Sequence, residues 1–128
     1  MKNSLGQPID IASERLRSII EQAEASFKAN NLEKCIELLA PHRSTLEEYG
    51  RRLLVTSVLK SEKWDLVIEI TDPPQSIEEL VARVTAYLRK REFARAREAL
   101  QSNANSLNID TIMKDALLER IRDEEAIG

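Results

Sequence analysis

The stretch Leu59-Lys60-Ser61-Glu62-Lys63-Trp64 decides how this sequence of 128 residues is expected to fold. An apolar-basic pair ends one amphipathic run, a short polar turn follows, and a bulky residue opens the next run. The same order recurs in Phe27-Lys28-Ala29-Asn30-Asn31-Leu32 and in Leu88-Arg89-Lys90-Arg91-Glu92-Phe93. The bulky residues that open the second run, at positions 32, 64 and 93, are 32 and 29 positions apart. A period near 30 in a helical pattern predicts stacked helical hairpins, each too small to bury its apolar face alone.

The composition supports one helical domain. Apolar residues make up 42% of the sequence, whereas three glycines and four prolines leave little material for β-hairpins or irregular loops. Gly6 and Pro8 fall within residues 1–9, which we expect to form a flexible N-terminal arm. Residues 10–128 are then expected to form a single domain, because a chain of this length supports one core.

The charge and the cysteine content exclude several classes of protein. The net charge of −3 is small and both signs are interspersed, so we expect no nucleic-acid partner. Cys35 is the only cysteine, which rules out an intrachain disulfide and fits a reducing cytosol. No stretch resembles an export signal or reaches membrane length. We therefore expect a cytoplasmic protein that does not bind a membrane.

The spacing of apolar residues predicts about seven helices, arranged as three hairpins followed by a helix that caps the last open face. The predicted starts lie near Asp10, Leu32, Ser44, Trp64, Ser76, Phe93 and Asp110. Ser44-Thr45-Leu46-Glu47 and Ser76-Ile77-Glu78-Glu79 both have the pattern of a capping box, in which a serine and a glutamate satisfy the first exposed amides of a helix. The fold class is therefore expected to be all-α.

This pattern resembles the tetratricopeptide repeat, in which a bulky residue opens the second helix of each hairpin. The small positions of the second helices fall at Cys35, Val67 and Ala96, and those of the first helices fall at Ala23, Val55 and Val84. The glycine that usually separates the helices is replaced by Asn30, Glu62 and Arg91. The resemblance covers residues 10–125 and implies a right-handed stack of about three degenerate repeats plus the capping helix.

The middle of the chain is also similar to the small tetratricopeptide-like chaperones that hold needle subunits in type III secretion. The similarity covers Arg51 to Lys90 and includes Leu53-Leu54-Val55-Thr56-Ser57-Val58-Leu59, a polar turn, an aromatic residue and a proline-containing link. It implies a chaperone of that class.

No set of residues suggests catalysis. His42 is the only histidine, and no serine and aspartate spacing accompanies it, so an exposed turn residue is the simpler interpretation. Cys35 falls on an apolar helix face and is expected to be an inert core thiol. One histidine and one cysteine cannot complete a zinc site, and the acidic run Asp123-Glu124-Glu125 is expected to be solvated. We therefore expect no enzyme, no metal and no cofactor.

A concave groove is the predicted binding site, because the first helices of stacked hairpins line one side of the array. Just before each turn stand the apolar residues Phe27, Leu59 and Leu88, followed by the cations Lys28, Lys60 and Arg89. Further residues occupy equivalent positions upstream of these turns in the first helices and complete the predicted lining: Ile20, Arg52, Val81, Thr56 and Thr85. The alternative is that the apolar residues pack against neighbouring helices and the cations interact only with the helix dipole.

The predicted function is a protein-protein interaction module that acts as a chaperone or adaptor. Its partner would be an amphipathic helical segment with apolar residues at i, i+3 or i+4 and i+7 and an acidic flank. Leu59→Glu combined with Leu88→Glu is expected to abolish capture. The alternative function is a homo-oligomeric or subunit scaffold that uses outer helix faces or the last helix, and Ile121→Asp is expected to disrupt its assembly.

Overall fold

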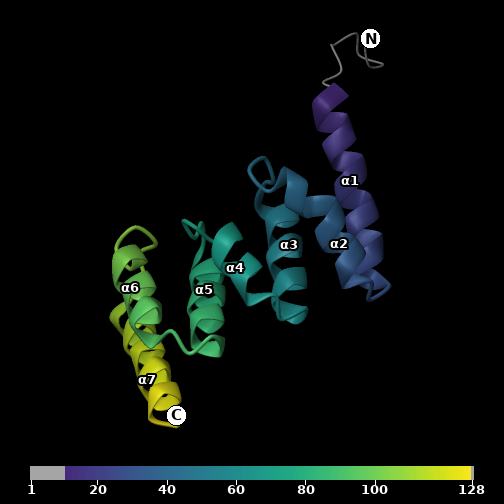
Figure 1. Cartoon of the computed structure of the whole chain (residues 1–128). Helices are drawn as coiled ribbons and strands as arrows, with labels where there is room; N and C mark the ends of the chain where they lie inside the picture. Colours follow the sequence, from purple (N-terminus) through teal and green to yellow (C-terminus); the bar gives the residue numbers. More distant parts are fainter. Residues whose placement is uncertain (1–10, 128) are drawn as a thin grey trace. The chain divides into compact units, whose positions relative to one another are not determined.

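The computed structural model describes residues 11–127, and the regular elements in that range are all helices (Figure 1). The elements are α1 (Ile11–Lys28), α2 (Leu32–Leu39), the 3-10 turn η1 (Ala40–His42), α3 (Glu48–Lys60), α4 (Trp64–Ile70), α5 (Ile77–Arg89), α6 (Phe93–Asn103) and α7 (Thr111–Ile127). Seven α-helices and no strand in this range confirm the all-α class. The predicted arm at residues 1–9 and the predicted cap at Asp10 lie outside the described residues.

Backbone contacts divide the chain into two compact units, residues 1–57 and 58–128. The first unit contains α1, α2 and the first part of α3, and the second contains the end of α3 with α4 to α7. The division therefore falls inside a helix. The single domain predicted for residues 10–128 comprises these two units, and each is considered by itself below.

The turns that join the helices of each predicted hairpin share one geometry. Asn30, Glu62 and Arg91 have positive φ angles of 60°, 56° and 60°. Each of these residues donates its N–H to the carbonyl three residues earlier, and the following N–H reaches the carbonyl five residues earlier, as in Asn31 to Ser26 at 2.7 Å. This is a Schellman motif, which satisfies the last carbonyls of a helix and requires a left-handed residue. The positions where the sequence lacks the usual glycine are thus left-handed, and Asn108 repeats the motif between α6 and α7.

The small positions predicted from the repeat pattern are buried. Relative exposures are 0% for Ala23, Cys35, Val67, Val84 and Ala96, and 6% for Val55. Small side chains at a crossing point let two helix backbones approach closely, so these residues fix how the helices of each unit cross.

Of the two predicted capping boxes, the one at Ser76 forms its serine half, with the glutamate bonded one residue earlier than predicted, and the one at Ser44 is wrong. Ser76 accepts a hydrogen bond from the Glu79 N–H at 3.1 Å, and the Glu79 carboxylate accepts one from the Gln75 N–H at 3.1 Å. The box at Ser44 does not form, because α3 begins only at Glu48. The turn that follows η1 ties the Thr45 hydroxyl to the His42 carbonyl at 3.0 Å.

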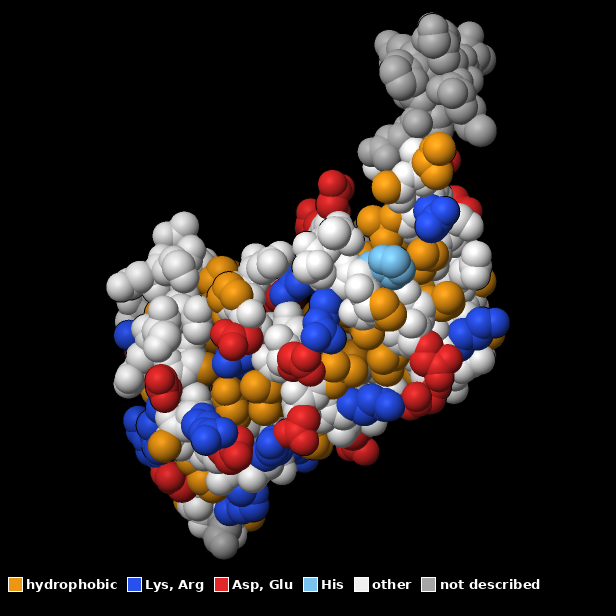
Figure 2. All heavy atoms as spheres, turned by 45° about the horizontal axis from the view of Figure 1, so that its top comes forward, with side chains coloured by type: hydrophobic (Ala, Val, Ile, Leu, Met, Phe, Trp, Pro, Cys, Tyr) orange, Lys and Arg blue, Asp and Glu red, His pale blue; other side chains and the backbone are white. Residues whose placement is uncertain are grey.

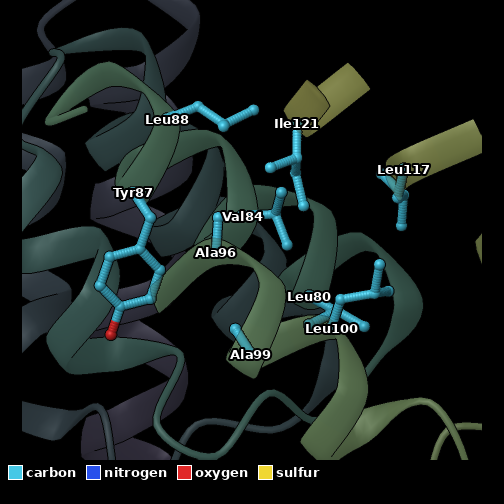
Figure 3. Packing of buried hydrophobic residues seen from close by; sticks show 9 residues of the cluster. All are labelled: Leu80, Val84, Tyr87, Leu88, Ala96, Ala99, Leu100, Leu117 and Ile121. Atoms are coloured by element: carbon cyan, nitrogen blue, oxygen red, sulfur yellow. The ribbon is translucent and has the colours of Figure 1, made fainter. Parts of the chain in front are cut away.

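The second unit has a closed core in which α5, α6 and α7 pack against one another (Figure 3). Its buried residues are Leu80, Val84, Tyr87 and Leu88 of α5, Ala96, Ala99 and Leu100 of α6, and Leu117 and Ile121 of α7. Full burial of a leucine or isoleucine side chain contributes about 1.5–3 kcal/mol. The last helix thus covers α5 and α6, as predicted for a capping helix.

Candidate binding groove

An open groove with a partly apolar lining runs along α1 of the first unit, bounded by the start of α3 and the preceding segment. Its volume is about 1010 Å³. Its apolar lining includes Leu16, Ile19 and Ile20 of α1, all half-buried, and Tyr49 of α3, which is 53% exposed. Figure 2 shows hydrophobic side chains beside the single histidine, which also lines this groove. The groove therefore exposes an apolar helix face to solvent.

The groove is open because α1 is much longer than its hairpin partner. α1 has 18 residues and α2 has 8, which at 1.5 Å per residue correspond to lengths of about 27 Å and 12 Å. The hairpin turn places α2 beside the C-terminal half of α1. The N-terminal half, which carries Leu16 and Ile19, is therefore left without α2 beside it.

Gly50 brings α3 close to α1 at the floor of the groove. A Cβ atom at this position would lie 3.1 Å from Leu46 Cδ2 and 3.3 Å from Ile20 Cδ1, closer than most Cβ contacts. The residue is buried within a helix, where glycine costs about 1 kcal/mol relative to alanine. The close approach to Ile20 is the structural reason for a glycine here.

A polar link joins the two walls of the groove. The Tyr49 hydroxyl donates to the Glu24 carboxylate, and Lys28 Nζ lies 3.4 Å from the same group. The hydrogen bond from Tyr49, with a smaller contribution from Lys28, lowers the pKa of Glu24, and the same bond raises the pKa of Tyr49. On the α3 wall, Arg52 pairs with Glu48 at 3.1 Å.

The eleven residues predicted for the groove are divided between the two units. The first unit contains Ile20, Phe27, Lys28, Arg52 and Thr56, and the second contains Leu59, Lys60, Val81, Thr85, Leu88 and Arg89. Of these, Ile20 and Arg52 line the groove of the first unit. The three predicted cations are the last residues of α1, α3 and α5 and are exposed, where they interact favourably with the helix dipoles.

Leu88 lies in a packed core and does not line an open surface. Its side chain is 4% exposed and belongs to the core of the second unit, where Ile121 of α7 also lies (Figure 3). Val81 packs against the same core, and the Thr85 hydroxyl donates to the Val81 carbonyl at 2.8 Å. The apolar stripe of α5 is wide enough to be covered from more than one side, so these residues serve packing.

Sequence reasoning missed Leu16, Ile19, Tyr49 and His42 as lining residues. The available signal was the length of the first apolar run, which extends well beyond what the short second helix can cover. The exposure of Tyr49 depends on where α3 begins, which the local sequence does not predict.

A second pocket, of about 360 Å³, lies in the other unit and is polar. Arg83, whose side chain is 13% exposed, donates to the Ile68 carbonyl at 2.6 Å and to the Tyr87 hydroxyl at 3.2 Å. The bond to Ile68 holds the last turn of α4 against α5, and the bond to Tyr87 lies within α5, so the arginine has a structural role.

Cys35 is fully buried, and burial raises the pKa of its thiol despite a hydrogen bond donated by the Ser57 hydroxyl at 3.2 Å. This setting disfavours the reactive thiolate. Between residues 11 and 127, no group of three or more histidine, cysteine, aspartate or glutamate side chains is arranged to hold a metal ion. In the same range, no helix is both long and apolar enough to cross a membrane.

Comparisons with family models, curated proteins and solved structures find no match for this chain. The resemblance to tetratricopeptide repeats therefore stays a prediction.

Proposed function

We propose that this protein binds an amphipathic helical segment of another protein in the groove of its first unit. The observation that supports this proposal is the half-buried face of Leu16, Ile19 and Ile20, whose N-terminal half extends beyond the reach of α2. Grooves of this kind accept a helix by burying residues at i, i+3 or i+4 and i+7. Contiguous apolar surface on a folded protein is a common mark of an interaction site.

A chaperone or an adaptor is the role that such a groove suits, because either one must hold an apolar segment of a partner away from water. A more specific proposal is that the protein is a needle-subunit chaperone of type III secretion. That more specific proposal rests on the sequence resemblance alone.

The proposal is tested with a labelled model peptide that forms an amphipathic helix with a leucine face. Leu16→Glu should weaken binding by at least about tenfold, because a carboxylate would then face the apolar side of the peptide. Fluorescence anisotropy measures the affinity, and circular dichroism checks that the variant keeps its helix content. Ile112→Glu, at a residue of α7 that is 82% exposed, is the matched control and should bind like the wild type. Undiminished binding by a folded Leu16→Glu variant would rule out this groove.

The variants suggested by the sequence must be replaced. Leu88 and Ile121 are 4% and 0% exposed, so a charge at either position would disrupt the core of the second unit. Loss of capture or of assembly in those variants would report unfolding.

A second candidate function is a scaffold that assembles through α7. Ile112 and Ile127 are 82% and 81% exposed on this helix, and Met113 is 37% exposed. Light scattering on the purified protein distinguishes the two functions. A discrete oligomer that dissociates in Ile112→Glu but persists in Leu16→Glu would favour the scaffold.

A further inference from the structure

We infer that the helix held in the groove carries lysine or arginine residues along its flanks; this inference rests on the proposed function. The sequence suggested the opposite sign, because Lys28, Lys60 and Arg89 were expected to form a basic edge. None of these three residues lines the groove of the first unit. The flanks of the partner must therefore be inferred from the charges that do line it.

The acidic side chains of the lining are Glu21, Glu24, Glu47 and Glu48, and the basic ones are Arg15, Arg17 and Arg52. Several of these charges are already compensated. Arg52 pairs with Glu48 at 3.1 Å, and Glu24 is held by Tyr49 and Lys28. Arg17 lies 4.0 Å from Glu14, a weaker pair at the surface.

The two remaining acids, Glu21 and Glu47, stand on different walls of the groove. Glu21 projects from α1, and Glu47 immediately precedes α3, where its carbonyl accepts the first helical hydrogen bond from the Arg51 N–H at 2.9 Å. Both side chains are exposed, and neither forms an ion pair among the described residues. The remaining basic residue, Arg15, lies six positions before Glu21, about 9 Å along the axis of α1.

This arrangement favours a partner helix with a basic flank on each side of its apolar face. Lysine and arginine can lay their alkyl stems along the apolar rim while the charged group reaches a carboxylate. Acidic flanks would instead approach Glu21 and Glu47 and be repelled. Such charges act mainly on the choice of partner and on the association rate, while the apolar face supplies most of the affinity.

The test uses two peptides with the same leucine face, one flanked by lysines and the other by glutamates. The wild-type protein should bind the lysine-flanked peptide about three- to tenfold more tightly at low salt. The preference should shrink in 1 M salt, where the screening length is about 3 Å. Glu21→Lys combined with Glu47→Lys should reverse the preference.

The matched control is Asp115→Lys combined with Glu119→Lys, which makes the same change in net charge at exposed positions of α7. It should leave the preference unchanged, because the substituted residues lie in the other unit.

The outcomes separate this inference from the proposed function. If neither peptide binds, the proposed function fails. If both bind equally, or the glutamate-flanked peptide binds more tightly, the inference fails and the proposed function stands. A dimer that dissociates when peptide is added would identify a second copy as the natural occupant. Much tighter peptide binding after deletion of residues 1–10 would assign the groove to that segment, and either result overturns the assignment to a separate partner.

Discussion

α1 of the first unit and α5 of the second are each the first helix of a hairpin, but they differ in how much of their surface is buried. Seven of the thirteen residues of α5 are buried, and α4, α6 and α7 all pack against this helix. Only Ala23 and Ser26 are buried among the eighteen residues of α1. Both helices carry an apolar stripe, and the difference lies in the number of neighbours. An apolar stripe identifies the face of a helix that is stabilised by burial. Whether that face is buried in a core or remains an open surface depends on the neighbouring helices.

The largest expected effect comes from placing the same charge in the closed core and in the open groove. Ile121→Asp should destabilise the second unit by more than about 4 kcal/mol, because Ile121 is fully buried and an aspartate there has no partner. Leu16→Asp should cost less than about 1 kcal/mol, because its side chain stays partly in water. Urea unfolding followed by circular dichroism measures both. Similar losses in the two variants would mean that the groove is as closed as the core.

A smaller effect should come from the left-handed turns of the two units. Glu62→Gly or Arg91→Gly in the second unit should raise the unfolding free energy by about 0.5–1 kcal/mol, since glycine adopts a positive φ without steric cost. Asn30→Gly in the first unit should change it by only a few tenths of a kcal/mol, because asparagine tolerates this region. Thermal unfolding measures these changes in unfolding free energy. Glu62→Ala is the control, because alanine keeps the steric cost of a positive φ angle. A destabilised Glu62→Gly would contradict the assignment of strain to this turn.

The smallest effect concerns the hydrogen bond between Tyr49 and Glu24 in the groove of the first unit. The pKa of Glu24 is lowered in the folded state, so the interaction stabilises the fold above the unfolded pKa and is lost as the pH falls through the folded pKa. Tyr49→Phe removes the main cause, so the pKa of Glu24 should move up towards its ordinary value while Lys28 still holds it slightly below. Carboxyl NMR titration measures the shift. An unchanged pKa in Tyr49→Phe would show that the hydroxyl does not hold this carboxylate.

Most of the secondary structure could be predicted from the sequence, because helix periods and turn residues are local properties. The predicted starts of the second helix of each hairpin, at Leu32, Trp64 and Phe93, coincide with the observed starts of α2, α4 and α6. The start of α3 was misplaced because Ser44 and Glu47 satisfy a local pattern, while the chain after Pro41 forms a 3-10 turn that delays the helix.

The binding surface could not be placed in the same way. Leu88 and Leu16 are both leucines on amphipathic helices, and nothing in their local sequence distinguishes them. Leu88 is buried because both α6 and α7 pack against α5, and Leu16 is half-buried because α2 stops short of it. The positions of neighbouring helices are tertiary information, so a repeat pattern predicts the stripe without predicting what covers it.

The distribution of two rare residues gives each unit its own natural reporter. Cys35 is the only cysteine and is fully buried in the first unit, while Trp64 is the only tryptophan and begins α4 in the second. The rate at which a thiol reagent labels the unmodified protein therefore follows opening of residues 1–57, and tryptophan fluorescence follows residues 58–128. Comparing the two signals during denaturation shows whether the halves of this protein melt together or one after the other, without any added label.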